Sequence, residues 1–253
     1  MMLRKKYQVI LCLLLALTPA AMQLAAQENA TTVKPFLEKL QQAYRNASRL
    51  GFHVRYRYAN AGQPGKYIDS LAGEIQLDKN RSRFVIDGTE TIITEKYSIN
   101  ILNDSKVIYL STAKGPSMMD PAGVLDSVIG HLKGIDVARA TRDGLDWLTI
   151  DFPPGQAYTR IRMGIDAQSG YIRQMSYDVH TAGWLDQDQI DKPGHPAPYQ
   201  TEGHVDIAFS HYQQGSFSDT LFNEGNFFYK TDGRYIPAGK YKDYNIFLAS
   251  SNL

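Results

Sequence analysis

The sequence has a single cysteine, few tryptophans and no surplus of either charge. Cys12 lies in an apolar segment near the N-terminus, so the chain beyond it has no thiol for a disulfide or a nucleophile. The 27 Lys and Arg residues nearly balance the 26 Asp and Glu residues, and the formal net charge is +1. This balance argues against nucleic acid as a partner, because proteins that bind nucleic acid usually carry a basic surplus.

Motifs that carry catalysis or hold a metal are also missing. The chain has no GxSxG motif and no glycine-rich phosphate loop, and the serines of "GPS" (115–117) and "QSG" (168–170) are typical of turns. The six histidines form no HxxxH or HxH pair, and the acidic stretch "DQDQID" lacks the glycine and final Glu of an EF-hand loop. We therefore expect no catalytic residue, no metal site, no cofactor and no enzymatic activity.

The N-terminus has the three parts of an export signal. A basic start of Arg4, Lys5 and Lys6 precedes the apolar stretch "VILCLLLAL", and "LAAQ" supplies small residues for cleavage. We expect a signal peptide over residues 1–26 and a periplasmic location for the rest of the chain. Lipid attachment at Cys12 is not expected, because Leu11 stands where a lipoprotein signal has a small residue.

A helix followed by strands is predicted by the hydrophobic periodicity. In "PFLEKLQQAYRNASRLG" apolar residues recur at helical spacing, which predicts a helix over about 33–50 with Pro35 in its first turn. In "FHVRYRYA" the period changes to two, which is typical of a strand. Short polar turns then separate further alternating segments, of which "TETIITEKYSINIL" reads as one strand. Together they predict an antiparallel meander of five strands.

The second half of the chain repeats this pattern around a second helix. "DPAGVLDSVIGHLKG" begins with an N-cap Asp and Pro and ends with Gly, which predicts a helix between Asp120 and Gly134. More alternating strands follow, interrupted by a long irregular loop over about 183–199. The tail from 217 to 253 is rich in Phe and Tyr, so we expect it to pack. We predict one α+β domain over residues 27–253, with an extended aromatic C-terminal region.

The order of these elements resembles the outer-membrane lipoprotein carrier (LolA/LolB-like) superfamily over residues 33 to about 180. The opening hairpin "AGEIQLDKNRSRFVIDG" is similar to a family signature of a glycine, an alternating strand, a basic turn and Arg-Phe, matched here by Gly73, Leu77, Arg83 and Phe84. The chain departs from the family pattern at Asn80, where proline is common, and at Ser105, where glycine is common. It has no lipobox cysteine, which places it nearer the soluble carrier branch, and its aromatic C-terminal region has no counterpart there.

The resemblance implies a curved antiparallel sheet that forms an incomplete β-barrel, covered by lid helices. In the family the hollow holds acyl chains of lipoproteins or other hydrophobic ligands, and burying each methylene gains roughly 0.8 kcal/mol. The implied function is a periplasmic carrier for a lipid or an acylated protein, with membrane-associated donor or acceptor proteins as further partners. Lys79, Arg81 and Arg83 would face water or anionic headgroups. The candidate ligand-binding residues, the last three of them on the lid, are Phe52, Val54, Tyr56, Tyr58, Ile75, Leu77, Phe84, Ile99, Ile101, Val124, Leu125 and Val128.

Two alternatives stay open at this point. An envelope scaffold or sensor could use the same fold for protein–protein contact, with a filled core and an exposed apolar patch, such as one on the aromatic tail. The 16 Tyr and 10 Phe residues also permit a carbohydrate-binding module, which would need an exposed row of aromatic side chains. The family arginine that ties the sheet to the lid has three candidates, Arg55, Arg57 and Arg83.

Overall fold

The computed structural model describes residues 27–113, 121–131, 134–181, 200–215, 217–250 and 253. The predicted signal peptide and the predicted loop over 183–199 lie outside these residues. The chain divides into two compact units, and three strands contribute residues to both. Unit 1 consists of Met1–Asn46, Arg55–Leu71 and Asp120–Phe209, and unit 2 of Ala47–Val54, Ala72–Met119 and Ser210–Leu253. The single domain over residues 27–253 stays a prediction.

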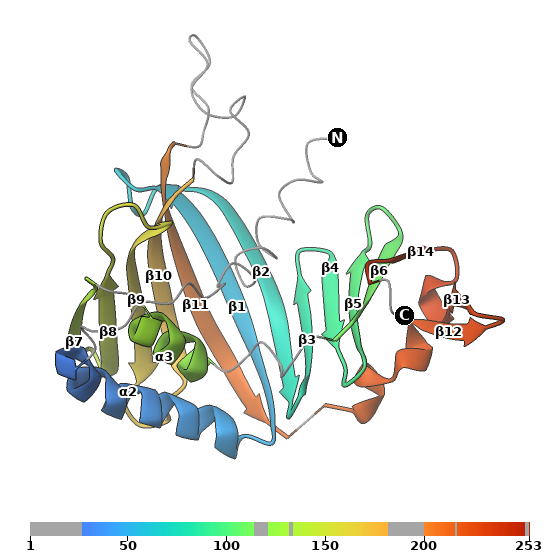
Figure 1. The fold of residues 1–253 in the computed structure, drawn as a ribbon, viewed down its shortest axis with the longest axis horizontal. Coiled ribbons are helices and arrows are strands. Elements are labelled where there is room, and N and C mark those ends of the chain that lie inside the picture. Colours follow the sequence, from blue (N-terminus) through green and yellow to red (C-terminus); the bar gives the residue numbers. More distant parts are fainter. Residues whose placement is uncertain (1–26, 114–120, 132–133, 182–199, 216, 251–252) are drawn as a thin grey trace, which may run out of the picture. The chain divides into compact units, whose positions relative to one another are not determined.

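The fold class is α+β, as predicted, and the main element is one open sheet (Figure 1). Its strand order is β14-β6-β5-β4-β3-β2-β1-β11-β10-β9-β8-β7, which leaves β14 and β7 as its two ends rather than closing into a ring. The strand pairs of assigned register are antiparallel except for β14 with β6, which is parallel. The elements up to the second helix are α2 (Gln27–Asn46), β1 (Arg49–Asn60), β2 (Tyr67–Asp78), β3 (Arg81–Ile86), β4 (Thr89–Ile93), β5 (Tyr97–Leu102), β6 (Val107–Thr112) and α3 (Pro121–His131). The remaining elements are β7 (Asp136–Arg142), β8 (Leu145–Asp151), β9 (Tyr158–Asp166), β10 (Ile172–His180), β11 (Glu202–Gln214), η2 (Asp219–Phe222), η3 (Glu224–Asn226), β12 (Phe228–Thr231), β13 (Arg234–Pro237), η4 (Gly239–Tyr241) and β14 (Asn245–Leu248).

The predicted bounds of one strand and of the first helix were wrong. The stretch 89–102, predicted as one strand, is the hairpin of β4 and β5. The predicted meander of five strands therefore contains the six strands β1 to β6. Its turn is closed by Thr94, whose Oγ1 accepts hydrogen bonds from the backbone N–H groups of Lys96 and Tyr97 at 3.2 and 3.0 Å. The first helix ends at Asn46 rather than near 50, because Leu50 is already buried in β1. The helix begins at Gln27 rather than near 33, so Pro35 lies inside α2 instead of in its first turn.

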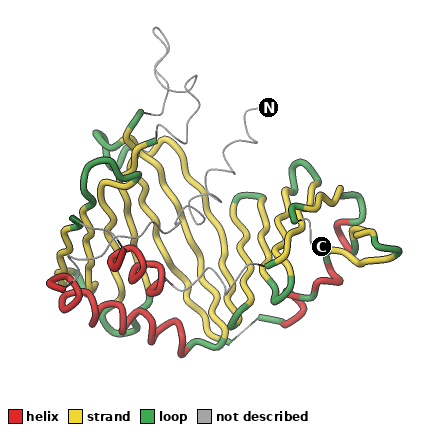
Figure 2. The backbone as a smooth tube through the Cα atoms, viewed as in Figure 1, coloured by secondary structure: helices red, strands yellow, loops and turns green. Residues whose placement is uncertain are grey.

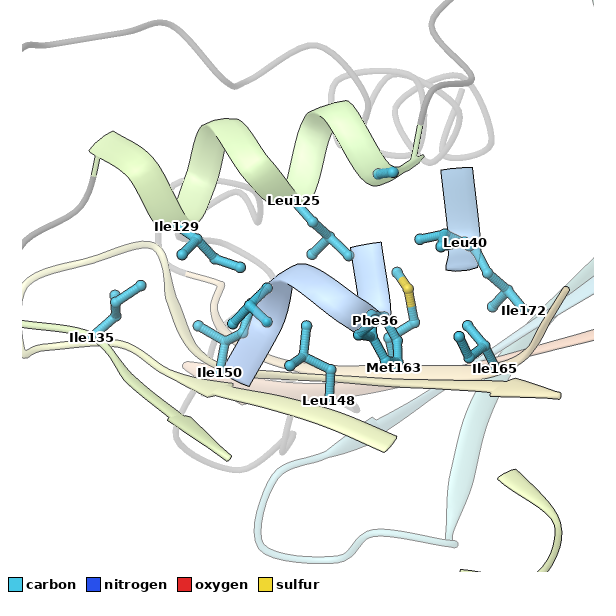
Figure 3. Close-up of a cluster of buried hydrophobic side chains, with 12 residues drawn as sticks. Phe36, Leu40, Leu125, Ile129, Ile135, Leu148, Ile150, Met163, Ile165 and Ile172 are labelled. Atoms are coloured by element: carbon cyan, nitrogen blue, oxygen red, sulfur yellow. The ribbon is translucent and has the colours of Figure 1, made fainter. Parts of the chain in front are cut away.

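The core of unit 1 lies between the two helices and the sheet. Phe36 and Leu40 of α2 and Leu125 and Ile129 of α3 point toward Leu148 and its neighbours on β8, β9 and β10 (Figure 3). The i, i+4 spacing of each helical pair puts both side chains on one face, as the periodicity predicts. Burial of one such Leu, Ile or Phe side chain contributes about 1.5–3 kcal/mol, so this layer holds the helices on the sheet.

Cross-strand register gives the sheet of unit 1 two different faces. On one face, here called the helix face, the rungs are Leu148, Met163, Met175, Ile207 and Ile150, Ile161, Tyr177, Val205. On the other, here called the polar face, the rungs are Thr149, Arg162, Ser176, Asp206 and Asp151, Arg160, Asp178, His204. Side chains of one rung share a face because the side-chain period of a strand is two. In unit 1, a surface that could bind an apolar ligand is therefore expected on the helix face and not on the polar face.

The core of unit 2 is made by the sheet and the C-terminal tail. Ile92, Ile99 and Leu110 form one rung across β4, β5 and β6, and the tail covers it with Phe222, Phe227, Phe228 and Tyr241. The tail consists of short helical turns, the hairpin of β12 and β13, and the edge strand β14 (Figure 2). The prediction that the aromatic tail packs is confirmed.

Candidate functional site

A tyrosine-rich region continues the helix face of unit 1 beyond the part that packs on the helices. This tyrosine patch consists of the buried residues Tyr177, Val179, Val205 and Ile207 and of the partly buried residues Tyr56, Tyr58, Tyr158 and Ile161. Met175 and Phe209 pack against both the patch and the helix-covered core, so the two apolar layers are continuous. Tyr158 and Tyr177 meet edge to face with ring centroids 5.7 Å apart.

Burial keeps the phenols of the patch in their neutral form. Desolvation raises the pKa of Tyr56 to about 12, and it raises the pKa values of Tyr158 and Tyr177 as well. The patch is therefore uncharged at any physiological pH. A tyrosine combines an apolar ring with a polar tip, which suits a ligand with an apolar chain and a polar head.

Gly203 provides the space that Tyr58 occupies. A Cβ atom at Gly203 would lie 2.6 Å from the Tyr58 hydroxyl oxygen and 2.8 Å from the ring. Gly203 lies on β11 and is paired with Val179 of the patch, which lies on β10. The ring of Tyr58 therefore lies over β11, next to the rest of the patch. Sequence reasoning missed Gly203, Tyr158 and Tyr177, because only the strand pairing shows that they adjoin Tyr56 and Tyr58.

The structure divides the twelve predicted ligand-binding residues between the two units. Tyr56 and Tyr58 lie in the tyrosine patch, Leu125 packs in the helix-covered core, and Val128 is buried on α3. The side chain of Val124 lies outside what the structure describes. Phe52, Val54, Ile75, Leu77, Phe84, Ile99 and Ile101 are buried in unit 2.

Within unit 2 the predicted residues do not share one surface. Ile75 and Phe84 form a rung with Thr91, whereas Ile99 and Ile101 lie on the other face of the sheet, under the C-terminal tail. The prediction of one strand over 89–102 puts Ile93, Ile99 and Ile101 on one face, because the side-chain period of a strand is two. The turn at Thr94 instead pairs Ile99 with Ile92 and leaves Ile93 opposite Ser98. For Ile99 and Ile101 this face is a filled core.

The expected exposure of the basic hairpin turn is correct only in part. Lys79 is exposed, and Arg81 pairs with Asp78 and Asp219. The prediction for Arg83 was wrong, because its side chain is only 17% exposed and its Nε donates to Oε1 of Glu90 at 2.7 Å. Arg83 shares a rung with Ile92 on the tail-covered face, where burial of the guanidinium is offset by this ion pair.

The polar face of unit 1 carries a histidine held between two carboxylates. His204 Nδ1 lies 2.5 Å from Asp178 Oδ1, and His204 Nε2 lies 3.3 Å from Asp206 Oδ1. Tyr67 donates its hydroxyl to Asp206 Oδ2 at 2.7 Å. The hydrogen bond that the His204 ring donates to Asp178 raises the pKa of His204 against the opposing effect of burial, and the same hydrogen bond lowers the pKa of Asp178. Among the described residues, no cluster of three His, Cys, Asp or Glu side chains could hold a metal ion.

This arrangement predicts a pH-dependent stability. Because the folded pKa of His204 is raised above its ordinary value of 6.5, its stabilising contribution is complete below about pH 6.5 and is lost as the pH rises through the folded pKa. We expect the urea midpoint of the wild-type protein to fall between pH 6 and pH 9 by more than that of His204→Gln. The exposed His53→Gln is the control and should follow the wild type. If the urea midpoints of the wild type and of His204→Gln fall equally between pH 6 and pH 9, the raised pKa of His204 is contradicted.

Comparisons with known proteins find similarity to solved structures only. No family model and no curated protein matches the chain. An uncharacterized conserved protein from Thermus thermophilus is 10% identical, with 86% of this chain and 99% of that chain covered and a TM-score of 0.48. A LolA superfamily protein from Nitrosomonas europaea is 10% identical, with 76% and 97% covered and a TM-score of 0.33. The MucB chain of a MucB–MucA(peri) complex is 13% identical, with 76% and 59% covered and a TM-score of 0.38.

Solved LolA-like structures are thus among those to which this chain is similar, and at these identities the similarity concerns the fold alone. Among the described helices, none is both long and apolar enough to cross a membrane.

Proposed function

We propose that the protein is a periplasmic carrier that holds a lipid or the acyl chain of a lipidated protein against the tyrosine patch of unit 1. The observation that supports this most is the continuity of the patch with the helix-covered core, through Met175 and Phe209. An acyl chain laid along the patch gains roughly 0.8 kcal/mol for each methylene that it buries, and it meets no charged group on the patch. The helices α2 and α3 are the lid, and the N-terminal signal pattern supports the periplasmic location.

Native mass spectrometry of the protein purified gently from the periplasm, followed by lipid extraction, tests this function. We expect a bound mass that releases a lipid or an acylated peptide. The apo protein is then titrated with palmitate and with a dipalmitoylated lipopeptide. Tyr56→Ala should weaken binding at least tenfold, because it removes a partly buried ring of the patch, while Tyr56→Phe should bind as the wild type does.

Two further variants complete this test. Tyr229→Ala is the matched control, because Tyr229 lies exposed in unit 2, outside the patch. Val128→Asp puts a charge on the buried side of α3 and should abolish uptake. Circular dichroism establishes that each variant is folded. A folded Tyr56→Ala protein that binds both probes with wild-type affinity would overturn the proposal.

A scaffold or sensor that contacts another protein is the second candidate, and the edge strand β14 favours it. The side chains of Phe247 and Leu248 are 51% and 55% exposed there, and Phe247 lies against the exposed Tyr109. The backbone N–H groups of Asn245 and Ala249 donate to the carbonyl oxygens of Lys106, just before β6, and of Leu110 in β6. The alternate residues Ile246 and Leu248 therefore direct their N–H groups away from β6. An exposed edge of this kind accepts an added strand. In the same mass spectrum a scaffold would retain a polypeptide rather than a lipid.

A further inference from the structure

Unit 2 contains a cavity that neither the carrier proposal nor the edge strand uses. Its volume is about 360 Å³, at the lower end of the range for small-molecule sites. It opens between the tail-covered face of β3 and β4 and the turns of the tail itself. Its lining residues are Arg83, Glu90, Thr220, Leu221, Gly225, Asn226, Phe227, Gly239, Lys240 and Tyr241.

The carboxylate of the cavity already has its partners. Glu90 Oε1 accepts from Arg83 Nε at 2.7 Å, and Oε2 accepts from the Tyr241 hydroxyl at 2.7 Å. Lys240 Nζ lies 3.7 Å from the same Oε2, too far for a direct hydrogen bond. Arg83 and Lys240 bring two positive charges against one negative charge, so the lining has an excess of one positive charge.

Two donor groups of these cations are left for a ligand. Lys240 is 71% exposed, and its Nζ lies 3.7 Å from Glu90 Oε2 and 4.7 Å from the centroid of the Tyr241 ring. Neither contact is a direct hydrogen bond, so its N–H donors can turn to a ligand. Arg83 uses Nε for Glu90 and Nη1 for Gln76, at 3.0 Å, and within the described residues its Nη2 makes no hydrogen bond. An anionic group placed between them would receive charge-assisted hydrogen bonds, which are stronger than neutral ones.

The rest of the lining is apolar and its loops are tied together. Leu221 and Phe227 supply apolar wall, and the Phe227 ring stacks on Tyr241 with centroids 5.7 Å apart. Asn226 Nδ2 donates to the carbonyl oxygen of Thr220 at 2.6 Å, which joins two turns of the tail. A Cβ at Gly239 would lie 3.0 Å from the Asn226 carbonyl oxygen, so these turns also pack closely. Such ties reduce the entropy that ligand binding would otherwise cost.

We propose that this cavity binds a small organic anion with an apolar or aromatic body, its anionic group held by Lys240 and Arg83 and its body against Phe227 and Leu221. The site is independent of the tyrosine patch, which lies in unit 1.

Benzoate is the probe, with benzyl alcohol as a neutral analogue and inorganic phosphate as an anion without a ring. Titration calorimetry of the full chain should show saturable benzoate binding below about 10 mM, the range for a ligand of this size. Benzyl alcohol and phosphate should each bind at least fivefold more weakly. A protein saturated with benzoate should bind palmitate with the same affinity as the protein without benzoate. The two sites are therefore tested separately, and failure of one proposal does not contradict the other.

Variants at exposed positions locate the site without disturbing the core. Lys240→Met should weaken benzoate binding at least fivefold, and Thr220→Trp should abolish it by filling the cavity. Lys242→Met is the matched control and should bind as the wild type does, because Lys242 does not line the cavity. The proposal is overturned if the wild type shows no saturable binding of benzoate, or if folded Lys240→Met and Thr220→Trp proteins bind it normally.

Discussion

Gly73→Ala is expected to destabilise unit 2 by about 3 kcal/mol, the upper part of the range for overpacking. A Cβ at Gly73 would lie 2.2 Å from the carbonyl oxygen of Val85 and 2.7 Å from Cγ1 of Ile86, both on β3. The first of these atoms belongs to the backbone, so no change of rotamer can relieve the contact. Hydrogen exchange of the β2 and β3 amides should accelerate by about 100-fold, since each 1.4 kcal/mol corresponds to a factor of ten.

Gly62→Ala is the control for this experiment. Apart from the two residues next to it in the chain, no described residue places a heavy atom within 4 Å of a Cβ at Gly62, and the φ of Gly62 is not in the left-handed region. The substitution should change stability by less than about 0.5 kcal/mol in a surface turn. Equal exchange rates for Gly73→Ala and the wild type would show that β2 and β3 are not in contact as described. The close approach of β3 also explains why a glycine is suited to the first position of the hairpin signature.

Glu90→Ala is the second large effect, with an expected loss of about 3–5 kcal/mol for a broken buried ion pair. The side chain of Glu90 is 6% exposed and neutralises Arg83 on the face that the tail covers. Its removal leaves the Arg83 guanidinium without a counter-charge and the Tyr241 hydroxyl without its acceptor. Urea denaturation followed by near-ultraviolet circular dichroism, which reports on the aromatic tail, measures the loss.

Two comparisons separate charge burial from other causes. Glu95→Ala removes an exposed carboxylate at the turn between β4 and β5 and should cost less than about 0.5 kcal/mol. The double variant Arg83→Met, Glu90→Leu removes both charges and should recover most of the stability, because an apolar pair of similar volume often replaces a buried ion pair without loss. If the double variant is as unstable as Glu90→Ala, the loss does not come from the unpaired guanidinium.

Predictions from local patterns succeeded where a single segment contains the whole signal. The apolar spacing of Phe36 and Leu40 predicted a helix with one buried face, and both side chains are fully buried. The alternation in β1 predicted that Tyr56 and Tyr58 share a surface, and both lie in the tyrosine patch. The aromatic composition of the tail predicted that it packs, since exposing so many rings to water would be costly.

The sequence by itself therefore determined the α+β class, the antiparallel pairing of the first strands and the buried face of the first helix. Only the tertiary structure decided which strands pair with each other and which segment covers each face of a strand. The turn at Thr94 moved Ile99 and Ile101 to the tail-covered face, and the same face received Arg83 with its partner Glu90. The physical reason is that alternation has a period of two and looks the same for either face, whereas the pairing partner and the covering segment are set by residues far away in the chain.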